Sequence, residues 1–137
     1  NSLGPNKRCL MNVCPVIGEQ GSKRFAFGAS GGRKILGAVA QLSSFVTDFG
    51  MTLEDSFHAP RIDASDAAHL IADESLPRAV LDRLREDNEV TETKRTIFPY
   101  AFACPAGVMR DGDRNAGCTE IMSPWGDAIA EDMTRKP

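Results

Sequence analysis

One apolar stripe, directly behind a glycine-rich turn, constrains the fold of this chain more than any other feature. Its five large side chains recur at intervals of four and three residues, at Ile35, Val39, Leu42, Val46 and Phe49. This spacing places them on one face of an α-helix, so the pattern predicts a helix over residues 35–49 that buries this face. Gly50 predicts the end of that helix, because glycine readily adopts the left-handed conformation of a helix cap.

Short apolar runs on both sides of this helix predict an α+β fold. Strands are expected at 13–17 and 23–27, joined as a hairpin, and at 61–64, 69–72, 89–97, 102–109, 118–121 and 125–130. Thr52 is expected to cap a short helix that ends before Pro60, and another helix is expected from Leu76 to Arg85. Strands and helices do not alternate regularly, which favours a mixed or antiparallel sheet packed on helices over a doubly wound sheet.

Composition excludes several classes of protein. The 137 residues are 42% apolar and 26% charged, which fits one globular domain, and no apolar stretch reaches the length of a membrane span. The net charge of −3 gives no basic surface for nucleic acid or anionic lipid, so neither is expected as a partner.

The cysteines and histidines do not predict a metal site. The four cysteines are expected to be buried thiols, with two disulfides as the alternative; they are Cys9, Cys14, Cys104 and Cys118. His58 and His69 have no ligand spacing to any cysteine, so neither a metal nor a cofactor is expected.

The segment between the first hairpin and the long helix is the strongest candidate for chemistry. It reads Gly28-Ala29-Ser30-Gly31-Gly32-Arg33-Lys34-Ile35. Glycines permit close approach of a ligand, and a helix N-terminus offers unpaired N–H groups with partial positive charge. Acyl transfer through an oxyanion and phosphate binding both fit this turn, although the phosphate-loop pattern lacks its second glycine and its hydroxyl residue. A purely structural strand-to-helix turn is the third alternative.

Four ordered blocks of sequence resemble the small subunit of γ-glutamyltranspeptidases. They are Gly4-Pro5-Asn6-Lys7-Arg8 with Leu10 and Pro15, the glycine turn, Asp48-Phe49-Gly50-Met51-Thr52-Leu53-Glu54, and Ala59-Pro60-Arg61-Ile62. The resemblance implies the C-terminal portion of an αββα sandwich of the N-terminal nucleophile hydrolase type, over residues 1–132, with a polar tail at 133–137. It also implies an enzyme that cleaves itself, exposes an N-terminal Thr and transfers a γ-glutamyl group, for example from glutathione, to water or an amine.

The same resemblance suggests roles for individual residues. Gly31 and Gly32 correspond to the backbone N–H pair that stabilises the tetrahedral intermediate. Met11 and Asn12 stand where the family has paired serines that hold the glutamyl carboxylate, and with Ser30 they are expected to line the substrate pocket. Because methionine cannot donate a hydrogen bond, a homologue acting on another amide and a noncatalytic structural module are the alternatives.

No Thr of this chain matches the nucleophile, since the first one is Thr47. We therefore expect a fragment that is inactive by itself and needs an upstream portion or large subunit as its partner. Division of a sandwich exposes sheet edges, which favours self-association. The sequence does not decide between a periplasmic and a cytoplasmic location.

The other polar candidates are expected to be structural. Lys7 and Arg8 are interpreted as a solvated pair, His58 as a capping or surface histidine, His69 as partly buried, and Trp125 as a packing residue. The carboxylates Asp63, Asp66, Asp73 and Glu74 are interpreted as solvated loop acids, without the spacing of a calcium site.

Overall fold

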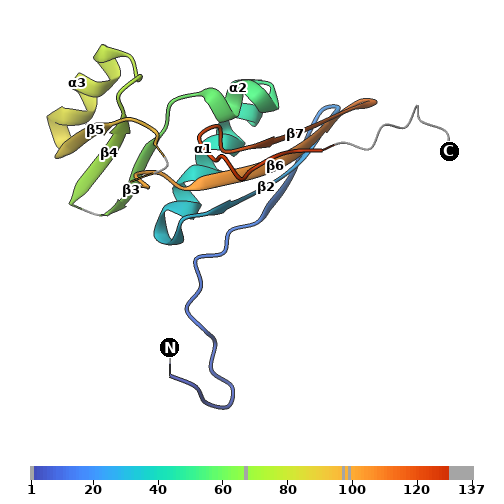
Figure 1. Cartoon of the computed structure of the whole chain (residues 1–137), viewed down its shortest axis with the longest axis horizontal. Coiled ribbons are helices and arrows are strands. Elements are labelled where there is room, and N and C mark those ends of the chain that lie inside the picture. Colours follow the sequence, from blue (N-terminus) through green and yellow to red (C-terminus); the bar gives the residue numbers. More distant parts are fainter. Residues whose placement is uncertain (1, 67, 97, 99, 130–137) are drawn as a thin grey trace.

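The computed structural model describes residues 2–66, 68–96, 98 and 100–129. Within these residues the chain forms two β-sheets and three α-helices (Figure 1). The elements in chain order are β1 (Val16–Gln20), β2 (Lys23–Ser30), the 3-10 turn η1 (Gly32–Lys34), α1 (Ile35–Thr47), α2 (Leu53–His58), β3 (Ile62–Asp66), β4 (His69–Asp73), α3 (Arg78–Asp87), β5 (Val90–Thr93), β6 (Cys104–Asp111) and β7 (Arg114–Thr119).

The larger sheet has the strand order β1-β2-β6-β7, and every neighbouring pair is antiparallel. β2 pairs with β6 over its whole length, so that Ser30 at the end of β2 lies opposite Cys104 at the start of β6. Helices α1 and α2 pack on one face of this sheet (Figure 1). The end of β2, where the glycine turn begins, is therefore fixed by the first residues of β6.

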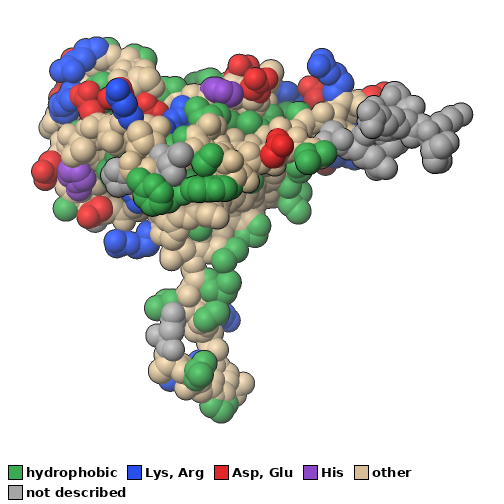
Figure 2. Space-filling model, viewed as in Figure 1, with side chains coloured by type: hydrophobic (Ala, Val, Ile, Leu, Met, Phe, Trp, Pro, Cys, Tyr) green, Lys and Arg blue, Asp and Glu red, His purple; other side chains and the backbone are tan. Residues whose placement is uncertain are grey.

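The smaller sheet has the order β3-β4-β5 and is mixed. β3 and β4 are antiparallel, whereas β4 and β5 are parallel and are connected through α3. Charged side chains concentrate over the α3 end of the molecule, where Arg78, Arg83 and Arg85 form ion pairs with nearby carboxylates (Figure 2). The two sheets together confirm the predicted mixture of antiparallel and mixed sheet with packed helices.

The core forms where the predicted helical stripe meets the larger sheet. Val39, Leu42 and Val46 are fully buried against aromatic side chains of the sheet and of α2, namely Phe25, Phe27 and Phe57. Phe49 does not belong to this stripe, because α1 ends at Thr47 and leaves the Phe49 ring 69% exposed.

The predicted boundaries of the helices are confirmed at two positions. Gly50 has a φ of 68°, the left-handed value expected after α1. Thr52 caps α2, since its Oγ1 accepts a hydrogen bond from the Asp55 N–H at 3.1 Å. α3 begins at Arg78, two residues later than predicted, because the Pro77 backbone is still extended.

The strand boundaries differ from the prediction at both ends of the larger sheet. β1 begins at Val16 rather than at residue 13. Gly112 adopts a φ of 59° in the β6–β7 turn, and Asp111 then pairs with Arg114, so β7 begins directly after the turn and ends at Thr119. Residues 121–129 contain no strand, so the strand predicted at 125–130 is wrong over its described part. The predicted tail at 133–137 lies outside the described residues.

The four cysteines are free thiols, so the disulfide alternative is wrong. Cys9 is exposed and the other three are half-buried, so the expectation of buried thiols is wrong for Cys9. Over the described part of the chain, no helix has both the length and the apolar character to cross a membrane.

Candidate functional site

The predicted glycine turn connects β2 directly to the helical region. Gly31 has φ 145° and ψ 19°, and Gly32 has φ 59°, both conformations that favour glycine. The Lys34 N–H donates to the Gly31 carbonyl at 3.2 Å and closes the turn. The chain can reverse from strand to helix here because two consecutive residues lack a β-carbon.

The surroundings of the two glycines differ. A β-carbon added to Gly31 would lie 2.8 Å from both the Cα and the Cβ of Ala103, a residue that is itself buried. A β-carbon added to Gly32 would meet no atom within 4 Å. Gly31 is thus confined by Ala103, the residue before β6, whereas Gly32 faces open space.

The backbone N–H groups of the turn are exposed and have no acceptor among the described residues. In the part of the chain that the structure describes, the N–H groups of Gly31 and Gly32 donate to no other residue. Both residues and Ser30 are exposed. Unpaired N–H groups at the start of a helix provide the donors that a developing negative oxygen requires.

The other two predicted pocket residues do not lie at this turn. Met11 and Asn12 belong to the N-terminal segment, residues 2–15, which forms no helix or strand and extends away from the body (Figure 1). Both are exposed, and no described contact joins them to Ser30, Gly31 or Gly32. The structure therefore gathers three of the five sequence-predicted site residues.

The charged side chain of Lys34 lies beside the turn. The Lys34 Nζ donates to the Ala101 carbonyl at 2.6 Å and lies 3.4 Å from the Asp63 Oδ2. Asp63 is only 6% exposed, so its interpretation as a solvated acid is wrong. These contacts attach Ala101 and β3 to the base of the turn.

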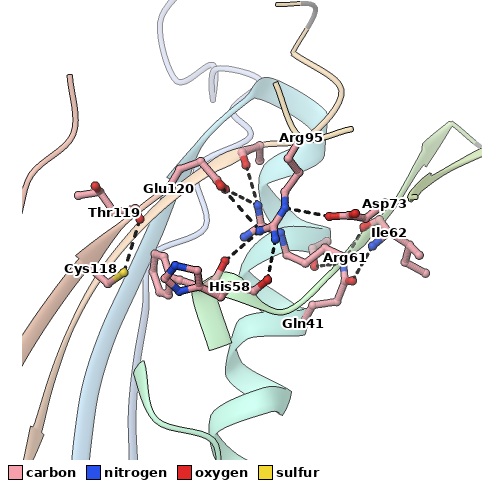
Figure 3. Close-up of polar contacts among 12 residues, drawn as sticks. Gln41, His58, Arg61, Ile62, Asp73, Arg95, Cys118, Thr119 and Glu120 are labelled. Atoms are coloured by element: carbon pink, nitrogen blue, oxygen red, sulfur yellow. Dashed lines mark hydrogen bonds and ion pairs between the residues drawn. The ribbon is translucent and has the colours of Figure 1, made fainter. Parts of the chain in front are cut away.

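Charged side chains that no sequence pattern predicted to be partners form a buried network (Figure 3). Arg61 binds the Glu120 carboxylate, and both side chains are 1% exposed. Arg95 lies 2.8 Å from Asp73, measured from Nε to Oδ2. Asp73 is buried, so its interpretation as a loop acid is also wrong, whereas Asp66 and Glu74 are exposed as expected.

Two thiols near this network have raised pKa values. Burial raises the pKa of the Cys104 thiol, and the nearby Glu120 carboxylate raises it further, against an opposing effect of Arg61. Burial also raises the pKa of the Cys118 thiol, with a contribution from Glu54. A raised thiol pKa disfavours the thiolate, which argues against nucleophilic catalysis by either residue.

The remaining candidates lie at the surface or near it. His58 is exposed at the end of α2, with its Nδ1 2.9 Å from the Glu54 carbonyl, and His69 is half-buried. Lys7 is exposed and binds Ser2. Trp125 is 75% exposed, so its interpretation as a packing residue is wrong. Among the described residues, no three His, Cys, Asp or Glu side chains gather as metal ligands.

Solved structures of known proteins share this fold. A γ-glutamyltranspeptidase from Pseudomonas nitroreducens in complex with L-DON has a TM-score of 0.73 at 18% identity, over 96% of this chain and 68% of that one. The Bacillus anthracis transpeptidase CapD has a TM-score of 0.73 at 18% identity, over 96% of this chain and 78% of that one. A mutant γ-glutamyltranspeptidase from Helicobacter pylori has a TM-score of 0.72 at 22% identity, over 88% and 66% of the two chains. These similarities confirm the predicted α+β fold of the N-terminal nucleophile hydrolase type.

No curated protein sequence matches the chain significantly. The sequence model of the family described as gamma-glutamyltranspeptidase, however, matches residues 1–124, which include the glycine turn and the buried charge network. The chain therefore belongs to the γ-glutamyltranspeptidase family.

Proposed function

We propose that this chain supplies the oxyanion site and part of the substrate pocket of an enzyme that cleaves a γ-glutamyl amide, such as glutathione, and passes the acyl group to water or an amine. The observation that carries the proposal is the turn itself. Gly31 and Gly32, both at positive φ, leave two adjacent N–H groups without a described acceptor at the start of a helix. Such donors stabilise the negative oxygen that forms when an amide carbonyl is attacked.

The nucleophile of the reaction would come from the upstream portion of the protein. In this family, by resemblance, it is an N-terminal Thr whose own α-amine acts as the base. Thr47 is unsuited to the task, because it is the last residue of α1 and its Oγ1 donates to the Ser43 carbonyl at 2.9 Å. The 137 residues by themselves are accordingly proposed to be inactive.

The upstream portion has a surface on which to pack. Ile17, Ala26, Val108 and Gly117 are opposite one another across four strands, on the face of the larger sheet that points away from α1. An open, mainly apolar groove of about 1040 Å³ runs along this face, and the Ile17 side chain is 89% exposed. We propose that a second sheet from the upstream portion covers it and completes the sandwich. Without that partner, the open face and the unpaired edges of β1 and β7 favour self-association, which analytical ultracentrifugation measures as a concentration-dependent increase in mass.

Met11 supports a second candidate class of amide substrate. It is exposed and apolar at the position where, by resemblance, a serine would hold the glutamyl carboxylate. A preference for an amide whose acyl group lacks that carboxylate follows from this difference. Parallel assays of a γ-glutamyl anilide and a simple acyl anilide distinguish the two specificities.

The test is co-expression of the chain with its upstream portion, followed by the γ-glutamyl anilide assay. Gly32→Ala places a methyl group at the exposed turn and disturbs the N–H pair, so kcat is expected to fall by at least about tenfold. Gly112→Ala is the matched control, because Gly112 has the same φ of 59° and the same open surroundings on the remote β6–β7 turn.

Two results would contradict the proposal. A processed, folded wild-type heterodimer without turnover would remove the γ-glutamyl activity and favour the noncatalytic alternative. Equal kcat values for the Gly32→Ala and Gly112→Ala enzymes would remove the oxyanion role from the turn.

A further inference from the structure

A chain of alternating charges runs through the interior between the two sheets, in the order Asp73, Arg95, Glu120, Arg61 (Figure 3). The Arg95 Nη1 lies 3.8 Å from the Glu120 Oε1, and the Glu120 Oε2 accepts from the Arg61 Nη2. Each charge here is shielded from solvent and depends on its neighbours, because an unpaired buried charge is strongly unfavourable.

Arg61 and Glu120, at one end of this charge chain, hold the segment that packs behind Gly31 and Gly32, the proposed oxyanion turn. The Arg61 Nη2 lies 3.4 Å from the Ala103 carbonyl, and the Glu120 N–H donates to the Pro105 carbonyl at 2.8 Å. Ala103 is the residue that confines Gly31. Arg61 and Glu120 therefore both contact the segment that borders Gly31.

The other end of the charge chain is fixed to two different elements. Arg95 donates to the carbonyls of Phe57 and His58 at the end of α2, at 2.9 and 2.6 Å, and binds Asp73 at the end of β4. A planar guanidinium held by acceptors on two elements has little freedom to move. Arg95 thereby fixes Glu120 relative to α2 and the smaller sheet.

We infer that Glu120 and Arg95 are positioning residues for the oxyanion turn, acting through Arg61 and Ala103 on Gly31. This inference rests on the proposed function. It predicts an effect on the chemical step, because a displaced N–H pair weakens stabilisation of the transition state more than binding of the substrate. A network that only stabilised the fold would change stability and leave kcat intact.

The first test is Glu120→Gln in the enzyme assembled with its upstream portion. The substitution keeps the size of the side chain and removes its charge. The expected result is a fall in kcat on the order of tenfold or more, since small displacements of catalytic groups have large effects, with KM within about twofold of wild type. Glu86→Gln is the matched control, because Glu86 is an exposed carboxylate that pairs with Arg83 on α3, and its kcat is expected to stay unchanged.

Arg95→Lys provides a second variant that keeps the charge and loses the planar fork. Its kcat is expected to fall in the same direction by a smaller factor. If the Glu120→Gln enzyme does not assemble, Arg95→Lys tests the inference instead, with the same criteria for kcat and KM. Folded variants whose kcat lies within about twofold of wild type would overturn the inference, even if their melting temperatures were lower.

Amide hydrogen exchange separates this inference from the proposed function. Glu120→Gln is expected to speed exchange in residues 101–107 and 28–33 and to leave the start of the β1–β2 hairpin unchanged. A wild-type enzyme without turnover would refute the γ-glutamyl activity, and the exchange rates would still decide whether Glu120 holds the turn. Unchanged exchange in both segments would refute the positioning role.

Discussion

Gly31 offers the sharpest test of how the turn is built. An alanine forced to a φ of 145° is strained by about 1–3 kcal/mol. Its β-carbon would also lie 2.8 Å from the Ala103 Cα, a backbone atom that no rotamer change can remove, which adds about 1–3 kcal/mol. The lower entropy of the unfolded alanine chain offsets about 0.4–1 kcal/mol. Gly31→Ala is therefore expected to lower the free energy of unfolding by about 3 kcal/mol, a large share of the stability of an ordinary domain.

Two other glycines calibrate this value. Gly32 and Gly112 share a φ of 59° and open surroundings, so their alanine variants carry only the left-handed strain. That strain, less the gain from the unfolded state, amounts to roughly 1 kcal/mol. Urea unfolding followed by far-ultraviolet circular dichroism measures all three variants, with equal slopes as evidence of a common unfolded state. A Gly31→Ala variant no less stable than Gly112→Ala would refute the steric argument.

Four further perturbations test other parts of the fold. Thr52→Ala removes the cap of α2 and is expected to cost about 1 kcal/mol of stability in thermal melts, whereas Thr52→Ser should retain most of it. Gln41→Leu removes the side-chain amide that forms hydrogen bonds with both backbone groups of Ile62, at 2.8 and 2.9 Å. The free energy of unfolding in urea should fall by about 2 kcal/mol. An unchanged free energy of unfolding would show that Ile62 finds other partners. Iodoacetamide at mildly alkaline pH should modify exposed Cys9 before Cys104 and Cys118, as read by mass spectrometry. The pKa values of the Cys104 and Cys118 thiols are raised in the folded state. The stability that these neutral thiols contribute is therefore fully present at neutral pH and falls as the pH rises into the range where an unfolded thiol ionises. The double variant Cys104→Ser, Cys118→Ser should show a smaller decrease of stability with pH.

Local features of this protein were set by sequence alone. Helix α1 follows from side chains three and four residues apart, and its end follows from the conformational freedom of Gly50. The cap at Thr52 and the turn at Gly31 and Gly32 have the same origin, because each depends on neighbours within a few residues. The family resemblance also rests on contiguous blocks, and the family match over residues 1–124 confirms it.

Only the tertiary structure decided which charges are buried and what stands behind the turn. Arg61 and Glu120 are 59 residues apart, and the hydrogen bonds of Arg95 cross 37 and 38 residues, so no local pattern marks these side chains as partners. Asp63 and Asp73 resemble solvated loop acids in the sequence. They become buried because β3 places Asp63 beside Lys34 and β4 places Asp73 beside Arg95. The confinement of Gly31 by Ala103 likewise arises from the pairing of β2 with β6. Periodicity and conformational preference fix local geometry, whereas contact between distant segments depends on how the sheets assemble.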